Sequence, residues 1–241
     1  MRLVYLDNAA TTRVCPEAAE KALEMMTVHF GNPSSLHSLG TQAEQMVEAA
    51  RKQVSKLFGC RPETLFFTSG GTEANNLAIF GAAEAKRRVG RHVVSTAVEH
   101  SSVLESFNEL ERQGFEVTRI VPDKNGVITP EQVAEACRRD TVLVSIMCVN
   151  NENGMHFPID RIAASVRRVA PQALIHSDAV QAAGKMPLPA EKMDIDLLSA
   201  SAHKLHGPKG CGVLYIKKGC RILPRAFGGG HERGLRAGTE A

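Results

Sequence analysis

One lysine of this sequence stands among residues that suit chemistry better than a solvent-exposed surface. Lys204 lies between His203 and His206 in the stretch "SASAHKLHGPKG". The residues before it are typical of an apolar strand, and burial at the end of such a strand favours the uncharged amine. A neutral amine attacks carbonyl carbons. Lys204 is therefore predicted to be a nucleophile rather than a surface charge.

A second candidate follows another apolar run, in "SGGTEANN". Gly71 and Thr72 stand there at the expected start of a helix, where free N–H groups and a hydroxyl suit a phosphate. The alternative is an ordinary turn in which Thr72 caps the helix. The stretch contains no G-x-G-x-x-G and no GKS or GKT, so dinucleotide and P-loop sites are disfavoured.

Three more apolar runs are also followed by polar residues. His100 begins a predicted helix, whose dipole favours the neutral ring, although a capping or packed histidine fits these residues better than catalysis. The stretch "NNENG" (150–154) fits a tight turn and a substrate-binding wall equally well. Asp178, three residues before Gln181, would be costly to bury without a cation, unless it caps a helix.

Seven short runs rich in Val, Ile and Leu are predicted to be the strands that position these residues. They are residues 64–69, 92–97, 116–121, 141–149, 173–179, 195–201 and 211–217. Helical periodicity is typical of segments 43–57, 72–88, 100–113, 130–139 and 159–169. This alternation predicts a mostly parallel α/β sheet, in which ligands bind beyond the carboxyl ends of the strands. The polar residues should therefore meet at one edge of the sheet.

Together these residues indicate a pyridoxal 5′-phosphate (PLP) site. A phosphate cradle, an acid, a histidine and a lysine at one sheet edge match what this cofactor needs. Lys204 would form the Schiff base, and Asp178 would pair with the pyridine nitrogen and keep it protonated. Each motif is weak by itself, and the hypothesis rests on their common position after the strands.

Composition excludes several other classes of protein. The chain has 241 residues, 43% apolar and 23% charged, which suits one large globular domain or one and a part. The net charge of +3 is spread along the chain, so nucleic acid is not an expected partner. No signal peptide or membrane span is predicted, and we expect a cytoplasmic protein. Six scattered cysteines without a C-x-x-C pair are expected to be reduced thiols, neither disulfides nor metal ligands.

The chain closely resembles the cysteine desulfurases of the NifS/IscS kind, in the class V aminotransferase group of fold-type I PLP enzymes. The motifs that carry the resemblance are "YLDNAATT", "GNPSSLH", "FTSGGTEANNLAI", "VEHSSV", "VNNENG", "HSDAVQ" and "SASAHKLHGPKG", in that family's order. The resemblance implies a three-layer α/β large domain with a mostly parallel central sheet. Residues 15–241 would form this PLP-binding domain, residues 1–14 would belong with a small domain, and the C-terminal small domain would be missing.

The resemblance also implies a role for each matching residue. Lys204 would bond PLP and later move protons at the substrate Cα, and His100 would stack on the ring as an acid–base group. Asp178 would face the pyridine nitrogen and Gln181 the phenolic oxygen. The remaining roles are phosphate binding by Gly71, Thr72, Ser201 and His203, contact with the substrate carboxylate by Asn151, and contact with the partner subunit's phosphate by Thr239 in a homodimer.

The implied reaction converts L-cysteine to L-alanine and passes sulfur as a persulfide to an acceptor or scaffold protein for iron–sulfur cluster or thio-cofactor assembly. In the family, the nucleophilic cysteine and the arginine that clamps the substrate lie beyond "RAGTE", and none of the six cysteines matches that position. We therefore expect a fragment with little turnover alone. The alternatives are a selenocysteine lyase or related class V transaminase, and a PLP-binding remnant without catalysis.

Overall fold

The computed structural model describes residues 3–241, which form one seven-stranded sheet with helices on both faces. All seven predicted strands are present, although most are shorter at their ends than the apolar runs. The strands are β1 (Leu65–Thr68), β2 (His92–Thr96), β3 (Glu116–Ile120), β4 (Thr141–Ser145), β5 (Leu174–Asp178), β6 (Leu197–Ser201) and β7 (Gly212–Ile216). Their order across the sheet is β1-β7-β6-β5-β4-β2-β3.

The sheet is mostly parallel, as predicted, with β7 as the exception. Strands β2 to β6 pair in parallel, whereas β7 pairs antiparallel with β6 on one side and β1 on the other. The chain between β6 and β7 is too short for the crossover that a parallel pair needs, so β7 turns straight back. Because β7 is antiparallel to both of its neighbours, β1 runs in the same direction as β6. The carboxyl ends of all strands except β7 therefore lie at one edge.

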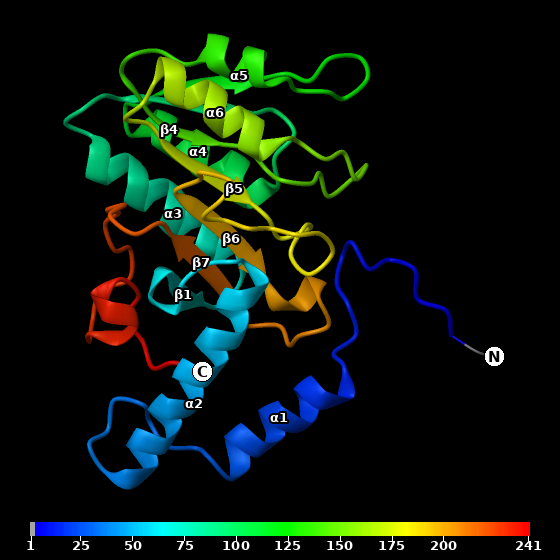
Figure 1. Cartoon of the computed structure of the whole chain (residues 1–241), viewed down its shortest axis with the longest axis vertical. Coiled ribbons are helices and arrows are strands. Elements are labelled where there is room, and N and C mark those ends of the chain that lie inside the picture. Colours follow the sequence, from blue (N-terminus) through cyan, green and yellow to red (C-terminus); the bar gives the residue numbers. More distant parts are fainter. Residues whose placement is uncertain (1–2) are drawn as a thin grey trace.

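Two helical layers enclose the sheet, which confirms the three-layer architecture (Figure 1). Along β4, Leu143 packs with α3 and α4, and the next residue, Val144, packs on the opposite face with α5 and α6. The helices are α3 (Gly71–Lys86), α4 (Ser101–Arg112), α5 (Pro130–Ala136) and α6 (Ile159–Val169), with short 3₁₀ turns at Pro62–Thr64, Ala202–Lys204 and His231–Gly234.

The two N-terminal helices lie outside these layers. Helix α1 (Pro16–Thr27) was not predicted and buries none of its residues, and α2 (Ser38–Leu57) leads from it to the sheet (Figure 1). Pro16 occupies the first turn of α1, where its missing N–H costs nothing. The proposed boundary between residues 14 and 15 remains a prediction. Within residues 3–241, the helices are all too short or too polar to cross a bilayer.

Candidate active site

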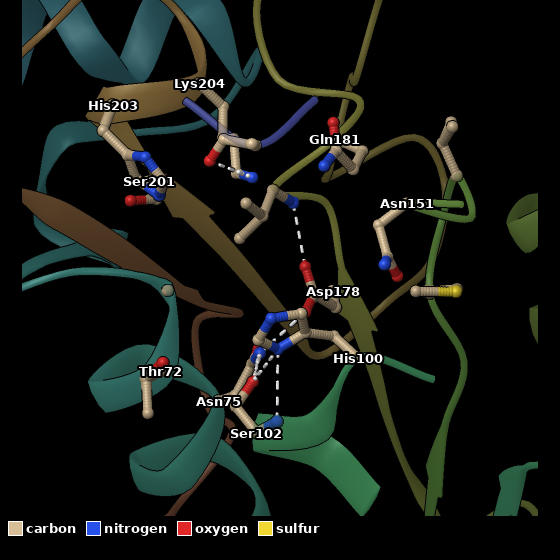
Figure 2. A pocket seen from close by; sticks show the side chains of 15 residues that line it. Thr72, Asn75, His100, Ser102, Asn151, Asp178, Gln181, Ser201, His203 and Lys204 are labelled. Atoms are coloured by element: carbon tan, nitrogen blue, oxygen red, sulfur yellow. Dashed lines mark hydrogen bonds between the residues drawn. The ribbon is translucent and has the colours of Figure 1, made fainter. Parts of the chain in front are cut away.

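A cavity of about 240 Å³ opens at the edge where the parallel strands end. Figure 2 shows the side chains that converge on it from β5, β6 and the helices that follow β1 and β2. Nine of the ten predicted site residues line it: Gly71, Thr72, His100, Asn151, Asp178, Gln181, Ser201, His203 and Lys204. The prediction that these residues share one edge of the sheet is therefore confirmed, whereas their individual roles remain predictions.

Asp178 is the buried acid of this cavity. Its residue exposure is 5%, and its two oxygens accept hydrogen bonds from Asn75 Nδ2 at 2.7 Å and from the Val180 N–H at 2.9 Å. The Val180 bond belongs to a turn, so Asp178 does not cap an α-helix. Among the described residues no cation forms an ion pair with it. Burial therefore raises the pKa of Asp178, although its hydrogen bonds and the charges of His100 and Lys204 oppose the rise.

Lys204 lies across the cavity on the 3₁₀ turn that follows β6. Its ammonium donates to the backbone carbonyls of Ala9 and Ala10, the latter at 2.8 Å. Burial lowers the pKa of Lys204, and the nearby charge of Lys185 lowers it further. The amine is thus closer to its neutral, nucleophilic form than a surface lysine would be.

The start of α3 is open to an anion. The helix begins after Gly70, and no side chain caps it, so the expectation that Thr72 might cap this helix is wrong. Gly70 has φ 152°, a conformation that favours glycine. A side chain at Gly71 would lie 2.7 Å from Val180 Cγ2, so its absence lets the helix start approach the cavity. The free N–H groups and the Thr72 hydroxyl can bind a phosphate there.

Ser201 and His203 complete this anion-binding corner. Ser201 ends β6 and is buried, and His203 Nδ1 lies 3.1 Å from the Thr11 hydroxyl. Burial lowers the pKa of His203, with smaller effects from Lys204 and Lys209, so its ring is neutral near pH 7. These groups can therefore offer hydrogen bonds to a phosphate without adding positive charge.

His100 caps a helix and also lines the cavity, whereas a catalytic role remains a prediction. It is the N-cap of α4, because its Nδ1 accepts the Ser102 N–H at 3.1 Å, and it also lines the cavity. Since Nδ1 accepts a backbone hydrogen bond, the neutral ring carries its proton on Nε2. That nitrogen is the one available to a ligand.

The "NNENG" stretch likewise combines the two hypotheses. Asn150 is buried and makes the turn, since its Oδ1 accepts the N–H groups of Glu152 and Asn153 and its Nδ2 donates to the Val98 carbonyl. Asn151, one residue later, lines the cavity. Turn formation and a place on the cavity wall thus fall to neighbouring asparagines.

The structure does not bring Thr239 into the cavity. Thr239 lines a neighbouring hollow together with Cys211, Glu232 and Arg236. Within residues 3–241 it is thus the one predicted site residue that lies away from the others. A role at a partner subunit remains a prediction.

Two buried side chains at this edge were not predicted. Asn75, one turn after Gly71, donates from Nδ2 to both Asp178 and the Ser102 hydroxyl and so orients the carboxylate. Glu99 is buried beside His100, and its Oε1 accepts from the Thr96 hydroxyl at 2.8 Å and the Met147 N–H at 3.0 Å. Burial raises the pKa of Glu99 to about 8. Both residues stand within the quoted motifs, but their contacts depend on the folded sheet.

Comparison with known proteins identifies the family. The sequence profile of the aminotransferase class-V family matches residues 4–238. The chain belongs to the aminotransferase class-V family. Its relatives in this family include the cysteine desulfurase IscS of Shewanella loihica, 48% identical over 243 residues, which cover 99% of this chain and 60% of that protein. The chain spans about three fifths of the length of the curated relatives it matches.

Solved structures of this family superpose closely. A NifS-like protein has a TM-score of 0.96 and 42% identity, covering 98% of this chain and 65% of its own. A structure titled "SspA in complex with cysteine" has a TM-score of 0.94 and 37% identity, covering 99% of this chain and 69% of that chain. The chain is thus similar in sequence and in fold to desulfurases of the NifS/IscS kind.

PLP is the cofactor of this family and of these relatives, and the residues of the cavity fit it. The fit rests on Asp178, a buried carboxylate whose partners are neutral donors and which would gain a cationic partner from a protonated pyridine nitrogen. Lys204 offers an amine, and the uncapped start of α3 offers donors for the phosphate. Within residues 3–241, no group of histidine, cysteine and acidic residues could hold a metal ion.

Proposed function

We propose that this chain is the cofactor-binding part of a PLP-dependent cysteine desulfurase, which converts L-cysteine to L-alanine and passes the sulfur on as a persulfide. The observation that carries the proposal is the shared cavity of Asp178 and Lys204, a buried acid without a cation opposite an amine of lowered pKa. The IscS relative and the cysteine complex of a similar protein support cysteine as the substrate.

Bound PLP supplies an electron sink for the bonds at the amino acid Cα. The Asp178 carboxylate, oriented by Asn75, would hold a proton on the ring nitrogen. Lys204 would carry the cofactor and then hold or move a proton at Cα. His100, with its proton on Nε2, would stack on the ring and exchange a proton with the substrate, and Gln181 would donate to the phenolic oxygen.

The remaining cavity residues would hold the carboxylate of the substrate and the phosphate of the cofactor. Asn151 would donate to the substrate carboxylate. The phosphate would accept hydrogen bonds from the start of α3, at Gly71 and Thr72, and from Ser201 and His203. Neutral donors of this kind orient an anion by geometry, which suits a site that must present Cα to Lys204.

Sulfur transfer needs a thiol in line with the substrate sulfur. Among the described residues none of the six cysteines lines the cavity. Burial raises the pKa values of Cys137 and Cys148 to about 12, which makes them poor nucleophiles at neutral pH. We therefore propose that the thiol which receives the sulfur is not one of these six.

The same proposal includes a setting for the protein. Thr239 would reach the phosphate of the partner subunit in a homodimer, and an acceptor or scaffold protein would take the persulfide for iron–sulfur cluster or thio-cofactor assembly. The protein would act in the cytoplasm. Residues 1–14 would belong with a small domain, and residues 15–241 would form the large one.

Covalent trapping tests the cofactor site. After incubation with PLP and borohydride reduction, mass spectrometry of peptides should find the reduced adduct on Lys204, and Lys204→Ala should abolish it. Lys185→Ala is the matched control, because that lysine lies beside the cavity and hydrogen-bonds Gln181 at 3.2 Å. An adduct that maps to Lys185 or Lys209 in the unaltered chain would refute the assignment.

Product analysis tests the reaction. The 241-residue chain loaded with PLP should give little alanine from cysteine, because no thiol of the described residues lines its cavity. Addition of a separate thiol protein or of the family's C-terminal part should raise alanine and persulfide together. Selenide from selenocysteine without sulfide from cysteine would favour a selenocysteine lyase. A persulfide on one of the six cysteines with equal alanine would contradict the proposed source of the thiol.

A further inference from the structure

A lysine that the proposed function leaves unused stands at the rim of the phosphate corner. Lys209 lines a hollow of about 520 Å³ together with Gly71, Thr72, Ser201 and His203, the residues that surround the open start of α3. It is exposed, and no hydrogen bond or ion pair joins its side chain to another described residue. Its ammonium is thus free to meet an anion bound in the hollow.

The charges around the hollow do not balance a phosphate ester. Such a group carries about −1.5 to −2 charges at neutral pH, whereas a helix start contributes roughly +0.5. His203 is neutral there. Lys204 lines the adjoining cavity but not this hollow. More than half of the negative charge therefore remains without a counter-charge from these groups.

Two further charges beside the hollow, on Glu73 and Arg236, leave this balance unchanged. Glu73 lies in the first turn of α3, but its carboxylate is bound by Arg236, with Nε to Oε1 at 2.9 Å, and by the Ser69 N–H at 2.6 Å. Arg236 and Glu73 thus neutralise each other. Lys209 is the one lysine or arginine among the described residues that line the hollow.

We infer that Lys209 is a further cofactor-binding residue, whose ammonium neutralises the phosphate that α3, Thr72, Ser201 and His203 hold by neutral donors. The inference rests on the proposed function, since it needs PLP in this cavity. Gly210 follows with φ 83° and open space around it, so the backbone at this corner is not crowded. Lys209 acts through charge alone, and the chemistry at Cα does not require it.

The test compares ligands with and without the phosphate. Equilibrium dialysis with pyridoxamine 5′-phosphate avoids the covalent bond to Lys204 and needs no tryptophan signal, which this chain lacks. Lys209→Gln should weaken its binding by about two- to fivefold at low salt, as expected for one partly exposed charge pair. The loss should shrink as salt is raised, because salt screens exposed charges. Lys209→Arg should retain affinity.

Matched controls keep the result interpretable. Lys218→Gln removes the same charge from an exposed lysine beyond β7, at the opposite edge of the sheet, and should not change affinity. Pyridoxamine without phosphate should bind the Lys209→Gln variant and the unaltered chain equally. Equal affinity of both proteins for pyridoxamine 5′-phosphate at low salt would overturn the role of Lys209. Failure of the unaltered chain to bind it at all would overturn the proposed function as well.

Discussion

Two buried carboxylates of this molecule have opposite surroundings. Glu232, in the C-terminal segment, is 4% exposed and accepts two hydrogen bonds of 2.9 Å from the Arg51 guanidinium and one of 3.1 Å from the Phe67 N–H. Asp178, in the cavity, is 5% exposed and has only neutral partners, Asn75 and Val180. The chain supplies a cation to the first acid and leaves the second for a ligand.

The difference separates a charge that the fold itself neutralises from one that it does not. Glu232 and Arg233 have φ values of 44° and 57°, which cost energy for residues with a side chain, and the buried ion pair with Arg51 holds that backbone in place. Asp178 lies on a regular strand and is held only by hydrogen bonds. A buried acid without a cation raises the free energy of the folded state, and a cationic ligand removes that cost.

The largest expected effect comes from breaking the structural pair. Glu232→Gln should lower the free energy of unfolding by about 3 kcal/mol, because the buried Arg51 then keeps only Glu48, a half-exposed carboxylate 2.8 Å from its Nε, as a charge partner. Urea denaturation measures the loss. Cofactor affinity of the folded protein should change little, since Glu232 does not line the cavity.

A double variant sharpens this prediction. Replacing both partners, as Arg51→Met with Glu232→Leu, should cost less than Glu232→Gln alone, because no buried charge is left unpaired and Glu48, which also loses Arg51, is half exposed to water. A loss below about 1 kcal/mol in Glu232→Gln would show that the pair does not stabilise the segment.

Glu99 extends the comparison to a buried acid that, among residues 3–241, hydrogen-bonds Thr96 and Met147 rather than a cation and does not line the cavity. Its ordinary pKa of 4.5 is raised to about 8 by burial, and the charge of Asp178 adds to the rise. Below about pH 4.5 the acid is protonated in both states. As pH rises, the unfolded chain loses this proton first, so stability falls through the range from about 4.5 to 8 and then levels off.

Glu99→Gln tests this assignment. The amide oxygen can accept from Thr96 and Met147 as Oε1 does, without a titrating proton. The difference in unfolding free energy between the two proteins should grow between pH 5 and 8 in favour of the variant, by an amount on the order of a few kcal/mol. A constant difference over that range would show that Glu99 is ionised in the folded protein.

Asp178→Asn should lower cofactor affinity more than stability, the reverse of what is expected for Glu232→Gln. The free energy of unfolding should change by only about 1 kcal/mol, since the side chain keeps its shape. Ionisation of the buried Asp178 lowers stability as the pH rises, and this contribution should be absent from the variant. Affinity for PLP should fall by about tenfold or more, the value of one charge-assisted hydrogen bond. Exchange of the Cα proton of a bound amino acid should slow while the bond to Lys204 persists.

The rate of proton exchange at Cα can also contradict the proposed role of Asp178. If Asp178→Asn exchanges the Cα proton of a bound amino acid at the original rate, Asp178 does not hold the ring nitrogen. If the variant instead loses several kcal/mol of stability, Asp178 is a structural acid like Glu232.

Sequence order explains which of these features could be predicted. The strands follow from local apolar runs, and parallel topology brings the residues after each strand to one edge, so Asp178 and Lys204 were found together. The Arg51–Glu232 pair joins residues 181 positions apart and has no local signal. The bond from Glu99 to the Met147 N–H spans 48 positions and depends on how β2 and β4 pair.

Helix α1 and the contact of Asn75 were not predicted for other reasons. Helix α1 has good helix formers and Pro16 in its first turn, which would have indicated it, but it buries no residue and so shows no apolar face directed to a core. Asn75 stands one turn after Gly71 in a motif that was quoted, but only the packing of α3 against β5 brings it to Asp178.

The smallest effect concerns His100, whose observed cap and proposed catalytic role use different atoms of one ring. Nδ1 caps α4, and the ring face and Nε2 are left for the cofactor. His100→Ala should lose about 1 kcal/mol of stability with the cap, whereas His100→Asn should keep most of it, because asparagine is a strong N-cap residue. Both variants lack the imidazole, so both should shift the absorption spectrum of bound PLP and slow the consumption of cysteine by the whole enzyme. Thermal denaturation and absorption spectra of the two variants separate the roles. An unchanged spectrum in His100→Asn, with a stability loss in His100→Ala alone, would make His100 a helix cap and nothing more.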